Sequence, residues 1–197
     1  GSGHNIALNE SKKDNIPFHL IINPDIVIKN NTIETLYDYM SKNSNVGIIM
    51  PKVLNTDGSV QFLCKKIPTP LDLFLRFFTK PSFMSNYKNQ FVLKNTGYNK
   101  TMNIPYLSGC FMFFNMQSIN NVGMFDERFF MYAEDIDISR RIHKKYKTIF
   151  YPFVNVIHHH EQSSYKNINM ALIHIISIIK YFNKWGWFFD KERKFFN

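Results

Sequence analysis

The order of apolar runs and amphipathic segments constrains the fold of this chain most. HLIIN (19–23) is a short apolar run closed by Pro24, which predicts a buried strand. VGIIMPKVL (46–54) predicts another strand. Between them, the spacing of apolar residues over 31–42 predicts an amphipathic helix whose buried face carries Ile33, Leu36, Tyr37 and Met40. Strand, helix and strand in this order are typical of an α/β layer with parallel pairing.

Further elements are expected downstream. TDGS (56–59) predicts a turn, and VQFLC (60–64) predicts a strand. A helix is expected over 68–78 and an irregular polar loop over 80–103. Two more strands are expected at 106–115 and 150–160, and a helix running to about Lys145 is expected between them.

Composition indicates one globular domain with a basic surface. The chain has 197 residues and 45% hydrophobic content, enough for one core and too little for two independent domains. Its formal net charge of +9 favours anionic partners such as phosphates, nucleotide sugars, nucleic acid or acidic lipid. Charge alone supports nucleic acid, and no nucleic-acid motif is present, so a nucleic-acid partner is not expected.

The two cysteines, Cys64 and Cys110, lie in apolar runs without a partner at metal-site spacing. They are expected to be buried thiols in a reducing compartment. The first fifteen residues lack a signal pattern, and no segment reaches the roughly 18 uninterrupted apolar residues that span a bilayer. A cytoplasmic protein is expected, with a contact at the inner face of the membrane as an option.

Three sets of polar residues follow predicted strands, where ligands of α/β sheets usually bind. They are Asn23 to Asp25, the acidic residues within 126–137, and His158 to His160. Asp25 and a histidine offer oxygen and nitrogen ligands suited to Mg²⁺ or Mn²⁺. Asp135 could serve as a general base.

Each set also has a structural interpretation. Asp25 could be a turn residue, and the histidines could form a solvated turn. Glu134, Asp135 and Asp137 could stabilise the positive end of a helix. The residue pattern by itself leaves these alternatives open and selects no reaction.

Five segments carry a resemblance to a known family: NPD (23–25), PKVLNTDGSVQFLCKKIPTP (51–70), YLSGCFMFF (106–114), VGMFDERFFMYAEDIDISRRI (122–142) and YPFVNVIHHHEQSS (151–164). Their order and spacing resemble the carboxyl-terminal two-thirds of a family 2 glycosyltransferase, in the branch that contains bacterial rhamnosyltransferases. The resemblance covers about residues 3–165 and implies a GT-A fold, with a mostly parallel sheet flanked by helices. It also implies an inverting transfer from a nucleotide-diphosphate sugar.

The resemblance implies roles for individual residues. Asn23 and Asp25 match the DxD-type motif, so Asp25 would bind Mn²⁺ or Mg²⁺, with His158 or His160 completing the metal site. Asp135 matches the catalytic base. Further substrate-binding positions are implied at His4, Asn5, Gly109, Asp126, Glu127 and Glu134; of these, Asp126, Glu127 and Glu134 lie on the acceptor side, and His4 and Asn5 lie near the donor.

The implied function is transfer of a sugar, with rhamnose as one candidate, to a saccharide or lipid-linked acceptor in cell-surface polysaccharide synthesis. Family members carry a nucleotide-binding part of roughly 70–90 residues ahead of the position of Gly1, judged by βαβ units of 30 or more residues. The sequence therefore predicts an incomplete GT-A domain over 1–165. It also predicts pairing through the exposed sheet edge, as a homodimer or with a separate amino-terminal piece. A non-catalytic binding module of the same fold is the alternative.

Residues 166–197 are expected to form a helical and aromatic extension. Within 167–184 a narrow polar stripe contains His174, Ser177, Lys180 and Lys184, and packing against the domain is expected. The tail KWGWFFDKERKFFN mixes aromatic and basic residues, a composition that suits a membrane interface.

Overall fold

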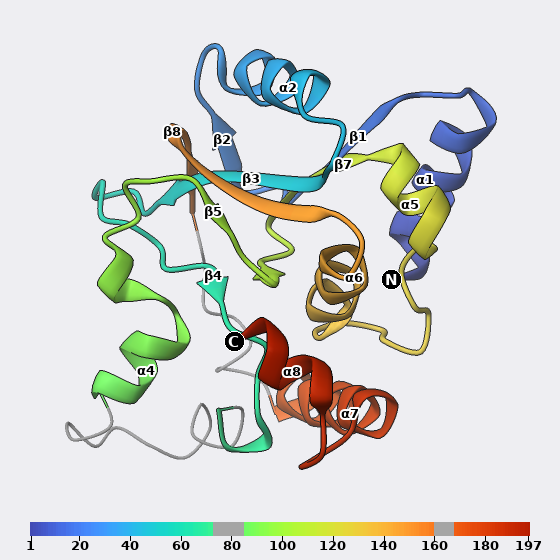
Figure 1. The fold of residues 1–197 in the computed structure, drawn as a ribbon, viewed down its shortest axis with the longest axis vertical. Helices are drawn as coiled ribbons and strands as arrows, with labels where there is room; N and C mark the ends of the chain where they lie inside the picture. Colours follow the sequence, from blue (N-terminus) through green and yellow to red (C-terminus); the bar gives the residue numbers. More distant parts are fainter. Residues whose placement is uncertain (73–84, 160–167) are drawn as a thin grey trace.

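A mixed central sheet forms the middle of the molecule (Figure 1). The computed structural model describes residues 1–72, 85–159 and 168–197. The strand order in the sheet is β1 (Phe18–Ile22), β7 (Phe111–Asn115), β3 (Val46–Leu54), β8 (Lys147–His158) and β2 (Ile26–Ile28). β5 (Met102–Asn103) also pairs with β8, and a separate two-stranded sheet joins β4 (Cys64–Lys65) and β6 (Tyr106–Leu107).

Strand direction in the sheet is mixed. β3 and β8 pair in parallel, whereas β7 lies between β1 and β3 and is antiparallel to both. β1, β3 and β8 therefore run in the same direction, and their carboxyl ends meet at one edge. β2 and β5 are antiparallel to β8. The expected α/β class with helices flanking a sheet is confirmed, and the parallel direction of β1 and β3 is realised across an intervening strand rather than by direct pairing.

Helices cover both faces of the sheet (Figure 1). α2 (Thr32–Lys42) lies on one side of β3 and β8, and α6 (Glu134–His143) lies on the other. A close approach fixes α6: a Cβ added at Gly47 of β3 would lie 2.5 Å from Cγ2 of Ile142. The remaining helices are α1 (Ser2–Lys13), α4 (Ser85–Phe91), the short 3₁₀ helix η2 (Lys94–Thr96), α5 (Met116–Val122), α7 (Ile168–Trp185) and α8 (Lys191–Phe196).

The hydrophobic core has two parts. The larger part lies between the sheet and its helices and includes Leu36, Ile48, Phe111 and Phe150, all fully buried. A second cluster packs α7 against α6 and the loop before it; its buried members are Ile67, Tyr106, Phe129, Ala133, Ile136, Tyr181 and Phe182. The expected packing of the carboxyl-terminal helix against the domain is confirmed for this inner face.

Several expected elements differ from the structure. Residues 61–63 form no strand; Val60 makes an isolated bridge to Leu54, and only Cys64 and Lys65 pair regularly. In place of an irregular loop, the described part of 80–103 contains α4, η2 and β5. The expected strand at 106–115 is interrupted at 108–110 between β6 and β7. Most of the helix expected over 68–78 lies outside the described residues.

Both cysteines are confirmed as buried free thiols. Burial raises the pKa of Cys64 far above that of an ordinary thiol, so it stays protonated at neutral pH. None of the helices in the described ranges is both long and apolar enough to cross a bilayer.

Candidate active site

Asp135 is held in a cradle of hydrogen-bond donors at the start of α6. Its Oδ2 atom accepts from the backbone N–H of Gly109 at 3.0 Å and from the hydroxyl of Tyr106 at 3.3 Å. Its Oδ1 atom accepts from the N–H of Ile136 at 2.9 Å. A Cβ at Gly109 would lie 3.2 Å from Cβ of Asp135, so the glycine lets the turn between β6 and β7 approach the carboxylate. The side chain is thereby fixed in one orientation.

The backbone that presents Asp135 is unusual. Tyr132 and Ala133, the two residues before α6, have φ angles of 66° and 64°. Non-glycine residues rarely adopt this left-handed conformation, and each costs on the order of 1–3 kcal/mol unless its surroundings fix it. Such positions concentrate at functional sites.

α7 supplies the contacts that hold this loop. The Ser177 hydroxyl donates to the carbonyl of Met131 at 2.6 Å, and Nζ of Lys180 donates to the carbonyl of Arg128 at 2.8 Å. The ring of His174 packs on that of Tyr132 with centroids 4.4 Å apart. The polar stripe seen in the sequence of α7 thus faces the loop that precedes Asp135.

Glu134 lies beside Asp135 at the start of α6. Burial, and secondly the negative charge of Asp135, raise the pKa of Glu134 to about 7. Its Oε2 atom is buried and accepts no hydrogen bond from the described residues. A carboxyl whose pKa is raised towards neutrality can act as a general acid or as a hydrogen-bond donor.

Glu134→Gln should change how stability depends on pH. A carboxyl whose pKa is raised by folding stabilises the native state below its unfolded pKa of about 4.3, and this stabilisation is lost as pH rises to about 7. The variant cannot titrate, so it should be more stable than the parent at pH 8 by on the order of 2–3 kcal/mol, relative to their difference at pH 4. Denaturant unfolding between pH 4 and pH 8 measures this; parallel pH profiles for both proteins would contradict it.

Asp25 and His158 form a second polar pair, at the ends of β1 and β8. Nε2 of His158 lies 3.3 Å from Oδ2 of Asp25. Gln61 donates from Nε2 to the His158 carbonyl at 3.0 Å, and its Oε1 lies 2.9 Å from Nδ1 of His158. An amide oxygen can only accept, so the proton of the imidazole lies on Nδ1.

This tautomer fits a metal ligand. When the imidazole is neutral, Nε2 of His158 presents a lone pair towards the carboxylate of Asp25, and two acceptors that face each other repel. A cation bound to both Nε2 and the carboxylate would relieve this repulsion. Oδ1 of Asp25 is also buried and accepts no hydrogen bond from a described residue. No group of three or more His, Cys, Asp or Glu at metal-binding distance occurs in the described ranges. Asp25 and His158 would therefore supply two ligands, which suits Mg²⁺ or Mn²⁺ that also binds phosphate oxygens and water. His160 lies outside the described residues.

The two carboxylates, Asp25 and Asp135, lie around one turn of the chain. The N–H of Asn23 donates to the carbonyl of Cys110 at 2.9 Å, and Cys110 follows Gly109. Burial is the main reason why the pKa of Cys110 rises to about 11; the negative charges of Asp135 and Asp25 both add to it, while Ser108 and Lys65 oppose it. The hydrogen bond from Asn23 joins the loop after β1 to the turn that contacts Asp135, and Asp25 in that loop pairs with His158, so the structure brings Asn23, Asp25, Gly109, Asp135 and His158 to one region.

Four other expected site residues meet at a structural turn: Asp126 and Glu127 belong to the turn at 125–127, and His4 and Asn5 of α1 pack on it. Asn5 is buried, donates to the carbonyl of Phe125 and to Oε1 of Glu127, both at 2.9 Å, and accepts from the N–H of Phe125. The ring of His4 lies 5.2 Å from that of Phe125. These contacts join α1 to the turn. Within the described part of the chain, no hydrogen bond of His4, Asn5, Asp126 or Glu127 reaches Asp25, Asp135 or His158.

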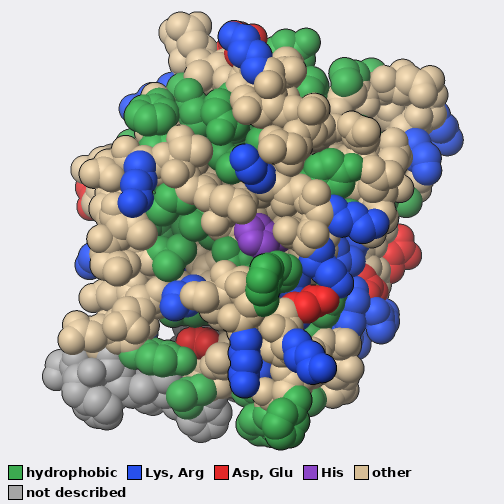
Figure 2. Space-filling model, viewed as in Figure 1, with side chains coloured by type: hydrophobic (Ala, Val, Ile, Leu, Met, Phe, Trp, Pro, Cys, Tyr) green, Lys and Arg blue, Asp and Glu red, His purple; other side chains and the backbone are tan. Residues whose placement is uncertain are grey.

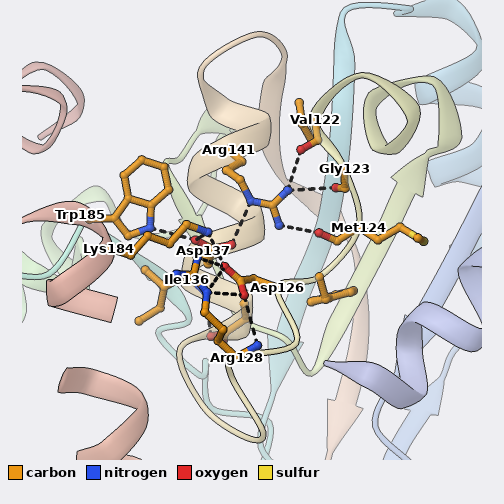
Figure 3. A network of polar contacts seen from close by, with 12 residues as sticks. Val122, Gly123, Met124, Asp126, Arg128, Ile136, Asp137, Arg141, Lys184 and Trp185 are labelled. Carbon is orange, nitrogen blue, oxygen red and sulfur yellow. Dashed lines mark hydrogen bonds and ion pairs between the residues drawn. The ribbon is translucent and has the colours of Figure 1, made fainter. Parts of the chain in front are cut away.

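Asp126 belongs to a network between α6 and α7 (Figure 3). Its Oδ2 atom lies 2.5 Å from Nη2 of Arg128 and 2.8 Å from Nζ of Lys184. Lys184 also lies 2.5 Å from Oδ1 of Asp137, which accepts from Nε1 of Trp185 at 2.8 Å. The hydrogen bond from Arg128 is the main cause of a pKa of Asp126 far below its usual value.

Asp137 is the buried centre of this network. It is fully buried, and its Oδ2 accepts from Nε of Arg141 at 2.9 Å. Arg141 in turn donates to the carbonyls of Val122, Gly123 and Met124 (Figure 3). Of the acids at the start of α6, Asp137 therefore fastens α6 to α7, whereas Asp135 faces the turn at Gly109.

Sequence reasoning missed three residues that shape the site. Gln61 orients His158, Tyr106 donates to Asp135, and Nζ of Lys65 lies 4.9 Å from the centre of the Tyr106 ring. Tyr106 had a usable signal, because a buried tyrosine needs a partner for its hydroxyl. The other two had none, since their partners are distant in sequence.

The chain is similar in sequence to two known proteins. No protein-family model matches the chain. It is 26% identical over 146 residues to the N-acetylglucosaminyl-diphospho-decaprenol L-rhamnosyltransferase of Mycobacterium tuberculosis, covering 74% of this chain and 48% of that protein. It is 26% identical over 173 residues to the rhamnosyltransferase WbbL of Escherichia coli, covering 84% of this chain and 63% of that protein. The chain thus spans about half to two-thirds of the length of these relatives.

A solved structure supports the fold. The crystal structure of GalNAc-T7 with UDP, GalNAc and Mn²⁺ matches 99% of this chain and 36% of that chain, with a TM-score of 0.59 and 15% sequence identity. The fold is similar to that of a GT-A glycosyltransferase. At this identity the likeness concerns the fold alone, and both sequence relatives are named as rhamnosyltransferases.

Proposed function

We propose that this chain forms the metal and acceptor side of an inverting glycosyltransferase. It would move a sugar, with rhamnose favoured by the two relatives, from a nucleotide-diphosphate donor to a saccharide or lipid-linked acceptor. The observation that carries the proposal is the placement of a cradled carboxylate, Asp135, and a ligand pair, Asp25 and His158, around the turn at 108–110. Assembly of cell-surface polysaccharide is the proposed role.

Asp135 is the proposed general base. Gly109 and Tyr106 donate to Oδ2, and Oδ1 keeps a second lone pair beside its bond from Ile136. This lone pair would take the proton of the acceptor hydroxyl as its oxygen bonds to the sugar carbon. The bond from that carbon to the diphosphate breaks on the opposite side, and the leaving diphosphate keeps the electron pair.

Glu134 would assist as a neutral neighbour. Its raised pKa keeps a large fraction protonated near neutral pH. A protonated Glu134 can donate a hydrogen bond to an acceptor hydroxyl while Asp135 takes the proton of that acceptor. One ionised carboxylate facing the acceptor meets the need of an inverting displacement.

Asp25 and His158 would hold Mn²⁺ or Mg²⁺ at the donor diphosphate. A bound divalent cation supplies Lewis-acid stabilisation of the charge that develops on a leaving diphosphate. Gln61 keeps the imidazole in the tautomer that presents Nε2. The GalNAc-T7 crystals contained Mn²⁺ together with UDP, which agrees with a cation in this fold.

Direct assay tests the proposal. The protein that carries this chain would be incubated with a panel of nucleotide-diphosphate sugars, Mn²⁺ and lipid-linked or free saccharide acceptors. Release of nucleoside diphosphate that requires both acceptor and cation is expected. Binding of donor without any acceptor-dependent release across the panel would favour a binding module instead.

Asp25→Ala and His158→Ala should each weaken Mn²⁺ binding in the presence of a nucleoside diphosphate by at least about tenfold, since each removes one of two protein ligands. Calorimetry measures the affinity. Asp57→Ala is the matched control, because this exposed carboxylate lies in the turn at 56–59. Unchanged affinity in both site variants would remove the metal assignment.

A further inference from the structure

The helix α7 carries apolar side chains on two faces, one packed on the domain and one exposed to solvent. On its inner face, His174 and Ser177 are buried beside Tyr181 and Phe182. Its outer face exposes four aliphatic side chains at helical spacing, Leu172, Ile175, Ile176 and Ile179, each between 42% and 53% exposed. Surface helices normally turn apolar residues inward.

Polar contacts prevent α7 from turning this face inward. Lys184 is paired with Asp126 and Asp137, and Trp185 donates to Asp137. Ser177 and Lys180 hold the carbonyls of the loop before α6. Rotation of the helix would leave the buried Asp137 without these partners, which is costly. The apolar outer face is therefore a fixed feature of the fold.

An aromatic loop follows the end of α7. Phe188 is 76% exposed and Phe189 is 97% exposed, although the backbone of the loop is well held. Arg193, itself buried, donates from Nη2 to the carbonyls of Trp187 and Phe188 at 3.0 and 3.3 Å. The N–H of Gly186 donates to the carbonyl of Phe182 at 2.7 Å. Two phenylalanines are thus presented to solvent on a preorganised loop.

Charge around the loop is segregated. The two acids form ion pairs with residues of α6 and its end. Asp190 pairs with Arg140, and Glu192 pairs with both Arg140 and Lys144. Lys191 and Lys194 are exposed, and neither forms an ion pair with any described residue. Phe195, which directly follows Lys194, is 85% exposed. Figure 2 shows hydrophobic side chains at the lower end of this face, where the α7 to α8 loop lies in Figure 1, with Lys and Arg side chains beside them.

We propose that the outer face of α7 and the loop at 186–189 dock on an anionic lipid bilayer. Aliphatic and aromatic side chains would enter the boundary between headgroups and acyl chains, and the lysines would contact anionic headgroups. Protruding phenylalanines flanked by lysines suit a lipid interface better than a second copy of this chain, because the lysines of two copies would repel each other. A bilayer also needs no matching surface of about 800 Å².

Docking would bring the site to its acceptor. The inner face of α7 holds the loop that presents Asp135, so the same helix would link the bilayer to the acceptor side. This link rests on the proposed function, whereas bilayer docking itself rests only on the surface.

Sedimentation with vesicles tests the docking surface. The protein should bind vesicles of phosphatidylcholine with phosphatidylglycerol, and binding should weaken with salt and with phosphatidylcholine alone. The double variant Phe188→Ser, Phe189→Ser should lose roughly tenfold or more in affinity, because these side chains supply the deepest apolar contact. Phe153→Ser is the control, since Phe153 is 67% exposed on β8.

Two outcomes would overturn the proposal. One is vesicle binding that the double variant leaves unchanged. The other is absence of vesicle binding together with a dimer in light scattering that the double variant dissociates, which would assign the surface to a second copy. Neither readout involves sugar transfer, so failure of the docking proposal and failure of the proposed function are distinguished.

Discussion

Asp135→Asn is expected to lower turnover by roughly 10²–10⁴-fold while leaving donor affinity nearly unchanged. The amide preserves size, and its oxygen can still accept from Gly109 and Tyr106. It cannot take the proton of the acceptor hydroxyl. Steady-state rates with a nucleotide-diphosphate sugar, measured together with calorimetric donor affinity, check the prediction.

A structural role for Asp135 has a different signature. If the carboxylate only stabilises the positive end of α6, the variant should lose at most about 1 kcal/mol of stability and keep near-normal turnover. Asp38→Asn, an exposed carboxylate on α2, controls for the loss of one negative charge. A variant with parental turnover and a lowered melting temperature would refute the general-base assignment.

Arg140→Met should cause the largest loss of stability of any single change considered, about 3–5 kcal/mol. Arg140 is 1% exposed, and its Nη atoms donate to both carboxylate oxygens of Asp190 at 2.6 and 2.7 Å. Its guanidinium also lies 4.0 Å from the centre of the Trp185 ring. The variant leaves the buried carboxylate of Asp190 without its cation, so urea unfolding should show a lower midpoint.

Two comparisons separate this effect from the loss of any surface ion pair. Lys13→Met breaks the pair with Glu10, in which both side chains are at least 60% exposed, and should cost about 0–1 kcal/mol. Arg140→Met combined with Asp190→Asn should recover part of the loss, because the uncompensated charge is removed. Equal losses in the single and double variants would show that packing on Trp185, rather than charge, accounts for the effect.

Local sequence signals predicted the strands and helices that are marked by an apolar run or by apolar residues at helical spacing. β1, α2 and β3 were found as elements from an apolar run or a helical stripe, but their burial was predicted only in part: in β1 only Ile21 is buried, and Tyr37, expected on the buried face of α2, is 47% exposed. The run at 60–64 had the composition of a strand, but residues 61–63 form no regular ladder; the N–H of Gln61 donates to the carbonyl of Val53 in β3, and only Cys64 and Lys65 continue as a strand. Strand propensity alone is insufficient.

The acids at the start of α6 also show that local sequence does not determine which partner a side chain contacts. Asp135 and Asp137 are two residues apart, so their side chains point about 200° apart on the helix. Sequence spacing marks both as acids at a helix start. Only packing decides that Asp135 meets Gly109 while Asp137 meets Lys184 and Trp185.

The sequence by itself determined the α/β class, the buried thiols and the strand ends at which Asp25 and His158 lie. Those features follow from residue type and local periodicity, which act over a few positions. The tertiary structure decided the contacts between distant segments: Gln61 with His158 across 97 positions, and Asn5 with Phe125 across 120. It also decided which face of α7 lies inward, because Asp137 is buried on α6 and needs partners that only another helix supplies.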